Sequence, residues 1–173
     1  MKAQNIILIG PMGSGKSTIG NILAKKLHRE FRDSDHFIEE KTGVDIGRIF
    51  DVEGENRFRD RESNALIELL EQDSQVVATG GGSVLRKENQ ALLISCGFII
   101  FLDTTVNQQL HRLRRDKKRP LLQTDNPRQR LEALFDERRP IYLDLADLAV
   151  KTDRKSARKL ASEIINQLPD HLL

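Results

Sequence analysis

A glycine-rich segment at 10–17, which reads GPMGSGKS, has the residue types and spacing that can hold a polyphosphate. It satisfies the pattern G-x-x-x-x-G-K-[ST] through Gly10, Gly15, Lys16 and Ser17. Glycines let successive backbone N–H groups curl around phosphate oxygens. The lysine can reach the β- and γ-phosphates, and the serine hydroxyl can ligate Mg²⁺. The segment therefore predicts binding of a polyphosphate together with Mg²⁺.

The residues on either side of this loop fit the same interpretation. An apolar run at 6–9 predicts a short buried strand, and helical spacing follows through Ile19, Ile22, Leu23 and Leu27. The positive end of that helix would face the phosphates. A chance glycine-rich turn is the competing interpretation, and the agreement of strand, loop and helix argues against it.

Length and composition favour one soluble domain over residues 1–173. The 173 residues are enough for a sizeable core, and the net charge of +2 does not favour a nucleic-acid-binding protein. The single cysteine, Cys96, excludes an internal disulfide framework, and its apolar surroundings place it in the core. No apolar run approaches a membrane span, and the N-terminal run is too short for a signal peptide. We expect a cytoplasmic protein.

Strand patterns alternate with helical patterns along the chain. Strands are predicted at 6–9, 30–34, 76–79, 98–102 and 148–150. Helices are predicted at about 16–28, 55–72, 87–95, 105–115, 127–139 and 155–168, with another beginning near His36. This alternation is typical of the α/β class, here a three-layer α/β/α sandwich around a central parallel sheet. Ligands bind such sheets beyond the carboxyl ends of the strands.

Two further strand ends carry residues that can do chemistry. Asp33 and Asp35 lie two apart, so in extended geometry both side chains point the same way. One carboxylate can support a metal, and the other can orient or deprotonate a hydroxyl group. Alternatively both cap the next helix, and Asp35 suits that role. Glycines at 80–82 either form a plain turn or let a ligand approach the backbone.

Two arginines fall on or beside apolar helix faces. Arg59 and Glu62 are i,i+3 neighbours and form either a surface ion pair or an oriented grip on an anionic group. Arg138 shares a face with Leu131 and Tyr142, so its guanidinium needs a carboxylate or a ligand as partner. Its neighbour Arg139 is expected to face solvent.

A basic segment lies at 112–119 and includes Arg112, Arg114 and Arg119. It favours a mobile lid at about 112–125 that brings Arg119 to the phosphates and excludes water. Nucleic-acid binding is the alternative, but no aromatic side chains are interleaved for base stacking.

Taken together, the motifs resemble those of the shikimate kinases over nearly the whole chain. The resemblance is carried by GPMGSGKST at 10–18, DSD at 33–35, GENRFRDRE at 54–62, TGGGSV at 79–84, RPLL at 119–122 and ERRPIY at 137–142. It implies a fold of the P-loop NTPase type with five parallel strands, a substrate-binding region at about 33–62 and a lid. It also implies transfer of the γ-phosphate of ATP to the 3-hydroxyl of shikimate, with Mg²⁺, by a monomer that binds no nucleic acid or membrane.

The resemblance also assigns roles to individual residues. Lys16, Asp35 and Arg119 would be catalytic. Shikimate would be held by Asp35, Arg59, Gly81 and Arg138, and the metal by Ser17 and, through water, Asp33. The ATP contacts would be Gly13, Ser14, Gly15, Lys16, Ser17, Thr18, Arg112, Arg119 and Arg154. A different small-metabolite kinase, such as a gluconate kinase, is the nearest alternative. A nucleotide-dependent switch is another, but the N-K-x-D motif of GTPases is absent.

Overall fold

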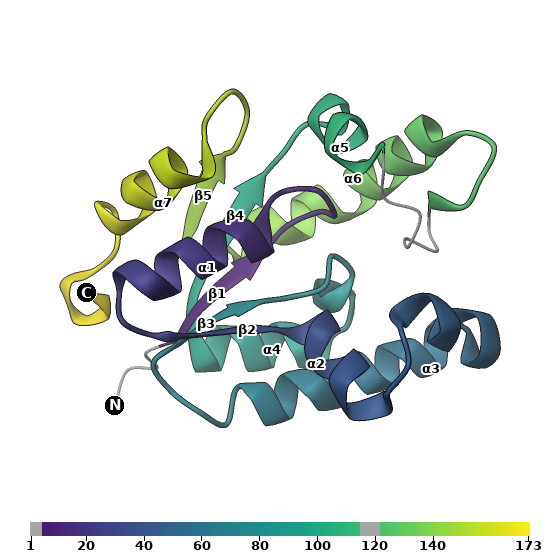
Figure 1. Ribbon diagram of the computed structural model, residues 1–173, viewed down its shortest axis with the longest axis horizontal. Coiled ribbons are helices and arrows are strands. Elements are labelled where there is room, and N and C mark those ends of the chain that lie inside the picture. The colour runs from purple at the N-terminus through teal and green to yellow at the C-terminus, as the bar shows by residue number, and fades with distance from the viewer. Residues whose placement is uncertain (1–4, 115–121) are drawn as a thin grey trace.

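Five parallel strands form the central layer of the molecule. The computed structural model describes residues 5–114 and 122–173, and Figure 1 labels its elements. The sheet has the order β2-β3-β1-β4-β5, and its neighbouring strands all pair in parallel. The strands are β1 (Asn5–Ile9), β2 (Glu30–Asp33), β3 (Gln75–Ala78), β4 (Gly97–Asp103) and β5 (Leu148–Lys151). The predicted five-stranded parallel sheet is confirmed.

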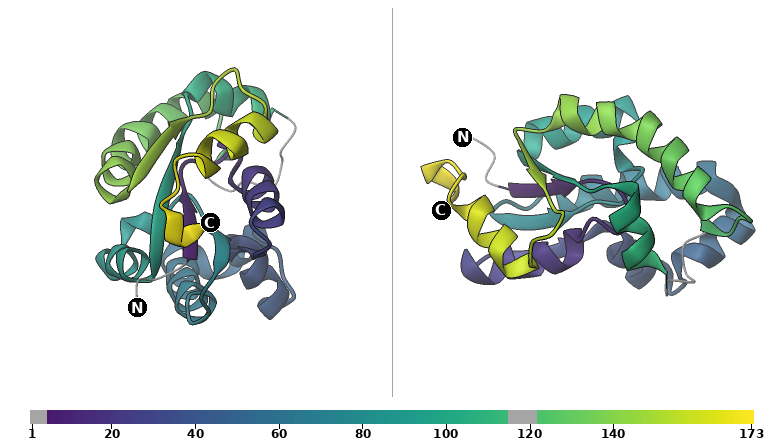
Figure 2. Two further views of the ribbon diagram at one scale, coloured as in Figure 1. Left: turned by 90° about the vertical axis from the view of Figure 1, so that its left-hand side faces the viewer. Right: turned by 90° about the horizontal axis from the view of Figure 1, so that it is seen from above.

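Helices cover both faces of this sheet, as the two views of Figure 2 show. They are α1 (Lys16–Lys26), α2 (Ser34–Thr42), α3 (Ile46–Leu69), α4 (Lys87–Cys96), α5 (Val106–Leu113), α6 (Pro127–Leu145) and α7 (Ala157–Ile165). Two short 3₁₀ helices are η1 (Ser83–Leu85) and η3 (Asp170–Leu172). The three-layer α/β/α arrangement is therefore confirmed.

The alternation of side chains along β1 divides the core into two apolar clusters. Ile6 and Leu8 pack with the buried faces of α1 and α7. Ile7 and Ile9 face the other way and pack with residues of α3, α4 and α6. Because successive strand residues point to opposite faces, a central strand covered on both sides must be apolar throughout. All of β1 is buried, which fixes the strand that leads into the phosphate loop.

Several predicted boundaries were wrong. The helix expected near His36 begins at Ser34, so β2 ends at Asp33. Helix α6 continues past Pro140 to Leu145. Proline removes one backbone hydrogen bond but leaves the neighbouring turns, and burial of Tyr142 and Leu145 favours the continuation.

Helix α3 is longer than predicted and is kinked at a glycine. It begins at Ile46, where the Asp45 side chain accepts a hydrogen bond from Arg48 N at 2.8 Å. Gly54 interrupts it with φ 80° and ψ 171°, a conformation that essentially only glycine adopts. This break explains why the helical spacing in the sequence was recognised only beyond residue 54. Together α2 and α3 enclose a small apolar cluster of their own.

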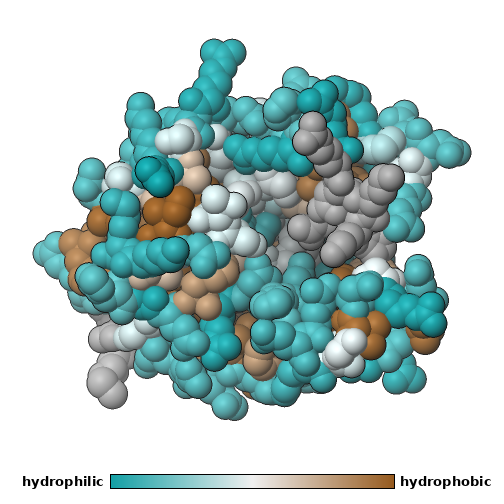
Figure 3. Space-filling view, viewed as in Figure 1, coloured by the Kyte–Doolittle hydropathy of each residue, from teal (hydrophilic) through white to brown (hydrophobic). Residues whose placement is uncertain are grey.

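The surface on the face seen in Figure 3 is mostly hydrophilic, with hydrophobic side chains in small separate groups. Cys96 is partly buried at the edge of the cluster formed by α3, α4 and α6, rather than deep in the core. Within residues 5–114 and 122–173, none of the helices is long and apolar enough to cross a membrane.

Candidate active site

The phosphate loop joins β1 to α1 and depends on glycines for its shape. Gly10, Gly13 and Gly15 have φ of 146°, 75° and 91°, where other residues are strained. At Gly10 there is also no room for a side chain, because a Cβ atom would lie 2.8 Å from the Leu102 carbonyl oxygen. Lys16 Nζ donates to the Gly10 and Pro11 carbonyl oxygens at 2.7 and 2.9 Å. The lysine head therefore lies over the loop.

A cavity of about 360 Å³ opens over this loop and the beginning of α1. Its lining includes most of the residues predicted to bind ATP, namely Gly13, Gly15, Lys16, Ser17, Thr18 and Arg112. Ser14 is buried beneath, and its hydroxyl accepts from Lys16 Nζ at 3.4 Å. The loop and the N-terminus of a helix of 11 residues thus converge on one polar cavity that suits an anion.

Asp33 connects this cavity to the next strand end. Its Oδ2 accepts a hydrogen bond from Ser17 Oγ at 2.6 Å. Its Oδ1 accepts from Asp35 N and His36 N at 3.0 and 3.3 Å and so caps α2. Of the two aspartates, Asp33 is therefore the cap, so the alternative in which both cap the next helix is right for Asp33 and wrong for Asp35. Asp35 lies in the first turn of α2 and lines the cavity.

The triple glycine follows β3 and is packed too closely for side chains at two positions. A Cβ atom on Gly80 would lie 2.6 Å from Glu62 Oε1 and 2.9 Å from Asp35 Oδ1. A Cβ atom on Gly82 would lie 2.4 Å from the Arg59 guanidinium nitrogens. The plain-turn interpretation is therefore incomplete, because these glycines let three charged side chains approach the backbone.

Arg59 and Glu62 form a buried ion pair on α3. Arg59 Nη1 donates to Glu62 Oε2 at 2.8 Å, and Arg59 Nη2 donates to Glu55 at 3.1 Å. Glu62 Oε1 accepts from Ser83 Oγ at 2.8 Å, so both carboxylate oxygens are engaged. Burial alone would lower the pKa of Arg59, but the two carboxylates outweigh it and the pKa is raised. The alternative of a surface ion pair is wrong.

Arg138 is buried on α6 and faces the same region. It is 5% exposed, and no carboxylate lies within ion-pair distance of it among the residues that the structure describes. Its guanidinium approaches the backbone of Gly81, with Nη1 3.7 Å from the position of a Cβ atom there. A buried cation without a carboxylate is costly, and an anionic ligand would offset that cost.

The neighbouring Arg139 does not face solvent freely, contrary to expectation. It donates to both carboxylate oxygens of Asp103, from Nε at 3.1 Å and from Nη2 at 2.9 Å. This hydrogen bonding raises the pKa of Arg139. This ion pair connects α6 to the end of β4. Arg139 therefore has a carboxylate partner, whereas the adjacent Arg138 has none among the described residues.

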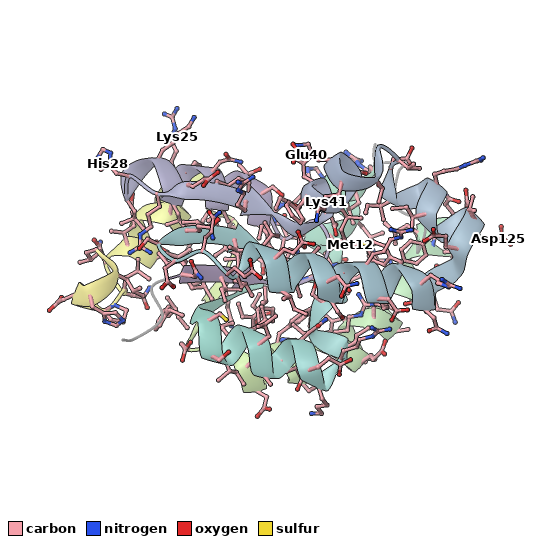
Figure 4. All side chains as sticks on the ribbon, turned by 90° about the horizontal axis from the view of Figure 1, so that it is seen from below. Met12, Lys25, His28, Glu40, Lys41 and Asp125 are labelled. Carbon is pink, nitrogen blue, oxygen red and sulfur yellow. The ribbon has the colours of Figure 1, made fainter. Side chains whose placement is uncertain are left out.

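A second cavity, of about 470 Å³, adjoins the first. Arg59, Glu62 and Arg138 line it, and the phenylalanine rings of Phe50 and Phe58 supply apolar wall. The residues that line both cavities are Met12, Ser17, Asp33, Asp35, Gly80 and Gly81. In Figure 4 Met12 lies toward the middle of the molecule, whereas Lys25, His28 and Asp125 lie at its periphery. The two cavities therefore form one two-part cleft.

The three arginines predicted to contact ATP differ in where they lie relative to the phosphate loop. Arg112 donates to the Gly13 carbonyl oxygen at 2.9 Å and so reaches the phosphate loop from α5. Arg154 is exposed with φ 59° and is not part of the lining of either cavity. Arg119, and with it half of the predicted lid at 112–125, lies outside the described residues.

Some contacts within the site were not foreseen from the sequence. Tyr142 donates its hydroxyl hydrogen to the Gly81 carbonyl oxygen. Ser34 Oγ accepts from Gly80 N at 3.0 Å, and Gln109 Nε2 donates to the Met12 carbonyl oxygen at 2.9 Å. Tyr142 and Ser34 lie within the ERRPIY and DSD motifs, which was the available signal. The sequence around Gln109 contains no motif that indicated its contact with the phosphate loop.

Comparison with known proteins agrees with this geometry. The family model described as "Shikimate kinase" matches residues 12–169. A shikimate kinase of Vibrio cholerae serotype O1 is 54% identical over 170 residues, 98% of either chain. One of Thioalkalivibrio sulfidiphilus is 57% identical over 163 residues, 94% of this chain and 86% of the other. A structure titled "Shikimate kinase from Acinetobacter baumannii in complex with shikimate" has a TM-score of 0.93 and 46% identity, and covers 96% of each chain. The chain belongs to the shikimate kinase family of ATP-dependent kinases.

Proposed function

We propose that this chain transfers the γ-phosphoryl group of ATP, with Mg²⁺, to the 3-hydroxyl of shikimate, giving shikimate 3-phosphate and ADP. One observation carries the proposal. A polar cavity over the phosphate loop meets a cation-lined cavity at Asp33, Asp35, Gly80 and Gly81. A phosphoryl donor and a small anionic acceptor placed in these two halves would have their reacting groups at that junction.

In the donor half, the chain holds the phosphates by backbone N–H groups, a lysine and the N-terminus of α1. Gly13, Ser14, Gly15, Lys16 and Thr18 are assigned to the phosphates, with Lys16 leaving its loop carbonyls for phosphate oxygens. Arg112, already in contact with the loop, is assigned to the nucleotide from the α5 side.

Ser17 and Asp33 fit a magnesium site. Hydroxyl and carboxylate oxygens are the donors that Mg²⁺ prefers in proteins, and it usually keeps several waters. Because Ser17 Oγ gives its hydrogen to Asp33 Oδ2, the lone pairs of Ser17 Oγ remain available to a cation. Asp33 would act through water. When bound, Mg²⁺ supplies charge neutralisation of the phosphates.

In the acceptor half, two guanidinium groups bind the substrate carboxylate. Arg59 is oriented by Glu62 and Glu55, and Arg138 is brought in from α6. Planar guanidinium groups match the two oxygens of a carboxylate. The backbone of Gly81 contacts the ring hydroxyl groups, because the absence of a side chain there lets them approach.

Asp35 is assigned to the acceptor hydroxyl. It lines both halves of the cleft, at the end of the strand next to the glycine loop. The hydroxyl oxygen attacks the γ-phosphorus, the bond from that phosphorus to the β–γ bridging oxygen breaks, and the bridging oxygen leaves with ADP. Asp35 orients the hydroxyl group and accepts its proton. Arg119 stays assigned to the phosphates, and Arg154 to the adenine side.

A coupled assay of ADP formation tests the proposal. We expect turnover that depends on shikimate, ATP and Mg²⁺ together, with gluconate as a control acceptor that gives none. Absence of shikimate-dependent ADP formation would contradict the proposal, and turnover with gluconate would favour a gluconate kinase.

We also propose that the protein is a cytoplasmic monomer without nucleic-acid partners. Analytical sedimentation would measure its oligomeric state.

A further inference from the structure

The hydroxyl group of Tyr142 binds one residue assigned to the acceptor and lies near another. It donates its hydrogen to the carbonyl oxygen of Gly81. Arg138 precedes Tyr142 by about one turn on α6, and its charge acts on the phenol. Arg138 Nη1 also lies 3.7 Å from the position of a Cβ atom on Gly81, so the phenol and the guanidinium meet at the same glycine. The glycine loop after β3 and helix α6 are thereby connected at a single atom.

The ring of Tyr142 is fixed independently of its hydroxyl group. Tyr142 is 2% exposed and belongs to the apolar cluster beneath α6. Its ring stacks on that of Phe101 in β4, with centroids 5.0 Å apart. Because aromatic packing already holds the ring, the position of the hydroxyl group is set by the core of the molecule.

Arg138 has few other restraints from the protein. No carboxylate pairs with it among the described residues, and its Nε has no hydrogen-bond partner there. Arg59, by contrast, is held by Glu62 and Glu55. A long side chain that is restrained poorly loses more conformational entropy when it binds a ligand.

We infer that Tyr142 is a positioning residue for the acceptor, which holds Arg138 and the Gly81 carbonyl in the arrangement that receives the substrate carboxylate and hydroxyls. The inference rests on the proposed function, because it concerns the same site. Tyr142 acts through its two neighbours and touches no reacting atom. Removing the hydroxyl group frees both neighbours and leaves the ring packing in place.

The phenol keeps its hydrogen at any ordinary pH. Burial raises the pKa of Tyr142 to about 12, although the nearby charge of Arg138 opposes this. The charged groups that act on it from α3 are Glu62, which raises the pKa, and Arg59, which lowers it. The hydroxyl group therefore donates to Gly81 throughout the pH range in which kinases work.

Steady-state kinetics of Tyr142→Phe tests the inference. We expect the KM for shikimate to rise up to about tenfold through the loss of the hydrogen bond that fixes the Gly81 carbonyl beside Arg138, with the KM for ATP unchanged. In the double variant with Arg138→Ala, the two losses should not add, because Tyr142 acts through Arg138. An unchanged shikimate KM, equal changes in both KM values, or additive losses would overturn the inference.

Ile164→Val is the matched structural control. Ile164 is fully buried in α7 on the opposite face of the sheet. We expect it to lower thermal stability and leave both KM values as in the unaltered chain. If stability alone governed the shikimate KM, this variant would raise it too, and the assignment of Tyr142 would fail.

A spectroscopic measurement on the unaltered chain gives an independent test. Tyr142 is the only tyrosine and the chain has no tryptophan, so its fluorescence reports one site. We expect shikimate to change this emission, and Arg138→Ala to abolish the change. Emission that is insensitive to bound shikimate would overturn the inference.

Failure of the unaltered chain to phosphorylate shikimate would overturn the proposed function. If the unaltered chain does phosphorylate shikimate and Tyr142→Phe has the same shikimate KM, only the role of Tyr142 is overturned.

Discussion

Arg138 and Arg139 are adjacent in sequence but lie in different surroundings. Arg139 is bound by both oxygens of Asp103, whereas Arg138 has no carboxylate partner among the described residues and lines the acceptor cavity. Arg139 thus forms a structural ion pair, whereas Arg138 is the cation that we propose to bind the substrate carboxylate. The contrast also provides a pair of variants that differ by one position in the chain.

We expect Arg138→Ala to weaken shikimate binding by about 2 kcal/mol, roughly thirtyfold, through loss of charged hydrogen bonds, and to leave ATP binding nearly unchanged. Calorimetric titration of both ligands measures this. Arg139→Ala should lower thermal stability slightly and leave shikimate affinity unaltered. Equal shikimate affinity in the two variants would remove the assigned role of Arg138.

Gly82 is a second residue at which a small change has a specific result. A methyl group there would lie 2.4 Å from the Arg59 guanidinium, so this group, which donates to Glu62, must shift. We expect Gly82→Ala to raise the KM for shikimate about tenfold or more. The control is Gly43→Ala, where φ is 68° but no atom lies within 4 Å of the new methyl group. That variant should lose stability only, and a comparable KM change in it would contradict the steric explanation.

The ionisation of Tyr142 gives a pH dependence with a definite sign. Burial raises its pKa from 10.0 to about 12, so the neutral phenol favours the folded state. This contribution is complete below pH 10 and is lost as the pH rises through about 12. The phenolate absorbance of the single tyrosine should titrate later in folded than in unfolded protein. A midpoint near 10 in folded protein would show that the ring is not desolvated.

The start of α2 combines helix capping with the proposed metal site. Asp33 caps this helix through Oδ1 and accepts from Ser17 through Oδ2, while Asp45 only caps α3. The carboxylate on β2 thus positions two elements that border the cleft. The sequence left open whether one or both aspartates cap this helix, because the choice depends on where β2 ends, and strand ends leave no local signal.

We expect Asp33→Asn to keep most of the capping energy and to raise the Mg²⁺ concentration needed for half-maximal activity, because an amide attracts a hydrated cation less than a carboxylate does. Asp45→Ala should cost about 1 kcal/mol of unfolding free energy through its lost cap and leave the Mg²⁺ dependence unaltered. Titration of activity with Mg²⁺ compares the two. An unchanged Mg²⁺ requirement in Asp33→Asn would contradict the metal assignment.

Much of the fold was predictable because the sheet is buried on both faces. Apolar runs such as 6–9 identified strands directly, and the phosphate loop marked the edge of the sheet to which the other strand ends would converge. The bend at Gly54 escaped prediction because an isolated glycine does not itself show that a helix runs on both sides of it. The continuation of α6 past Pro140 escaped prediction because tertiary packing of Tyr142 and Leu145 overrides local propensity. For the same reason the contact of Tyr142 with Gly81, 61 residues apart, left no periodic signal.

In the whole molecule, one cleft has a donor half on the phosphate loop and an acceptor half under α3 and α6. We propose that the two substrates meet at Asp35, and a crystal structure of the chain with ADP and shikimate would test this. We expect the shikimate carboxylate on Arg59 and Arg138, its 3-hydroxyl at Asp35 and the β-phosphate within the loop at Lys16. A shikimate carboxylate bound away from both arginines, or a 3-hydroxyl turned away from Asp35, would contradict it.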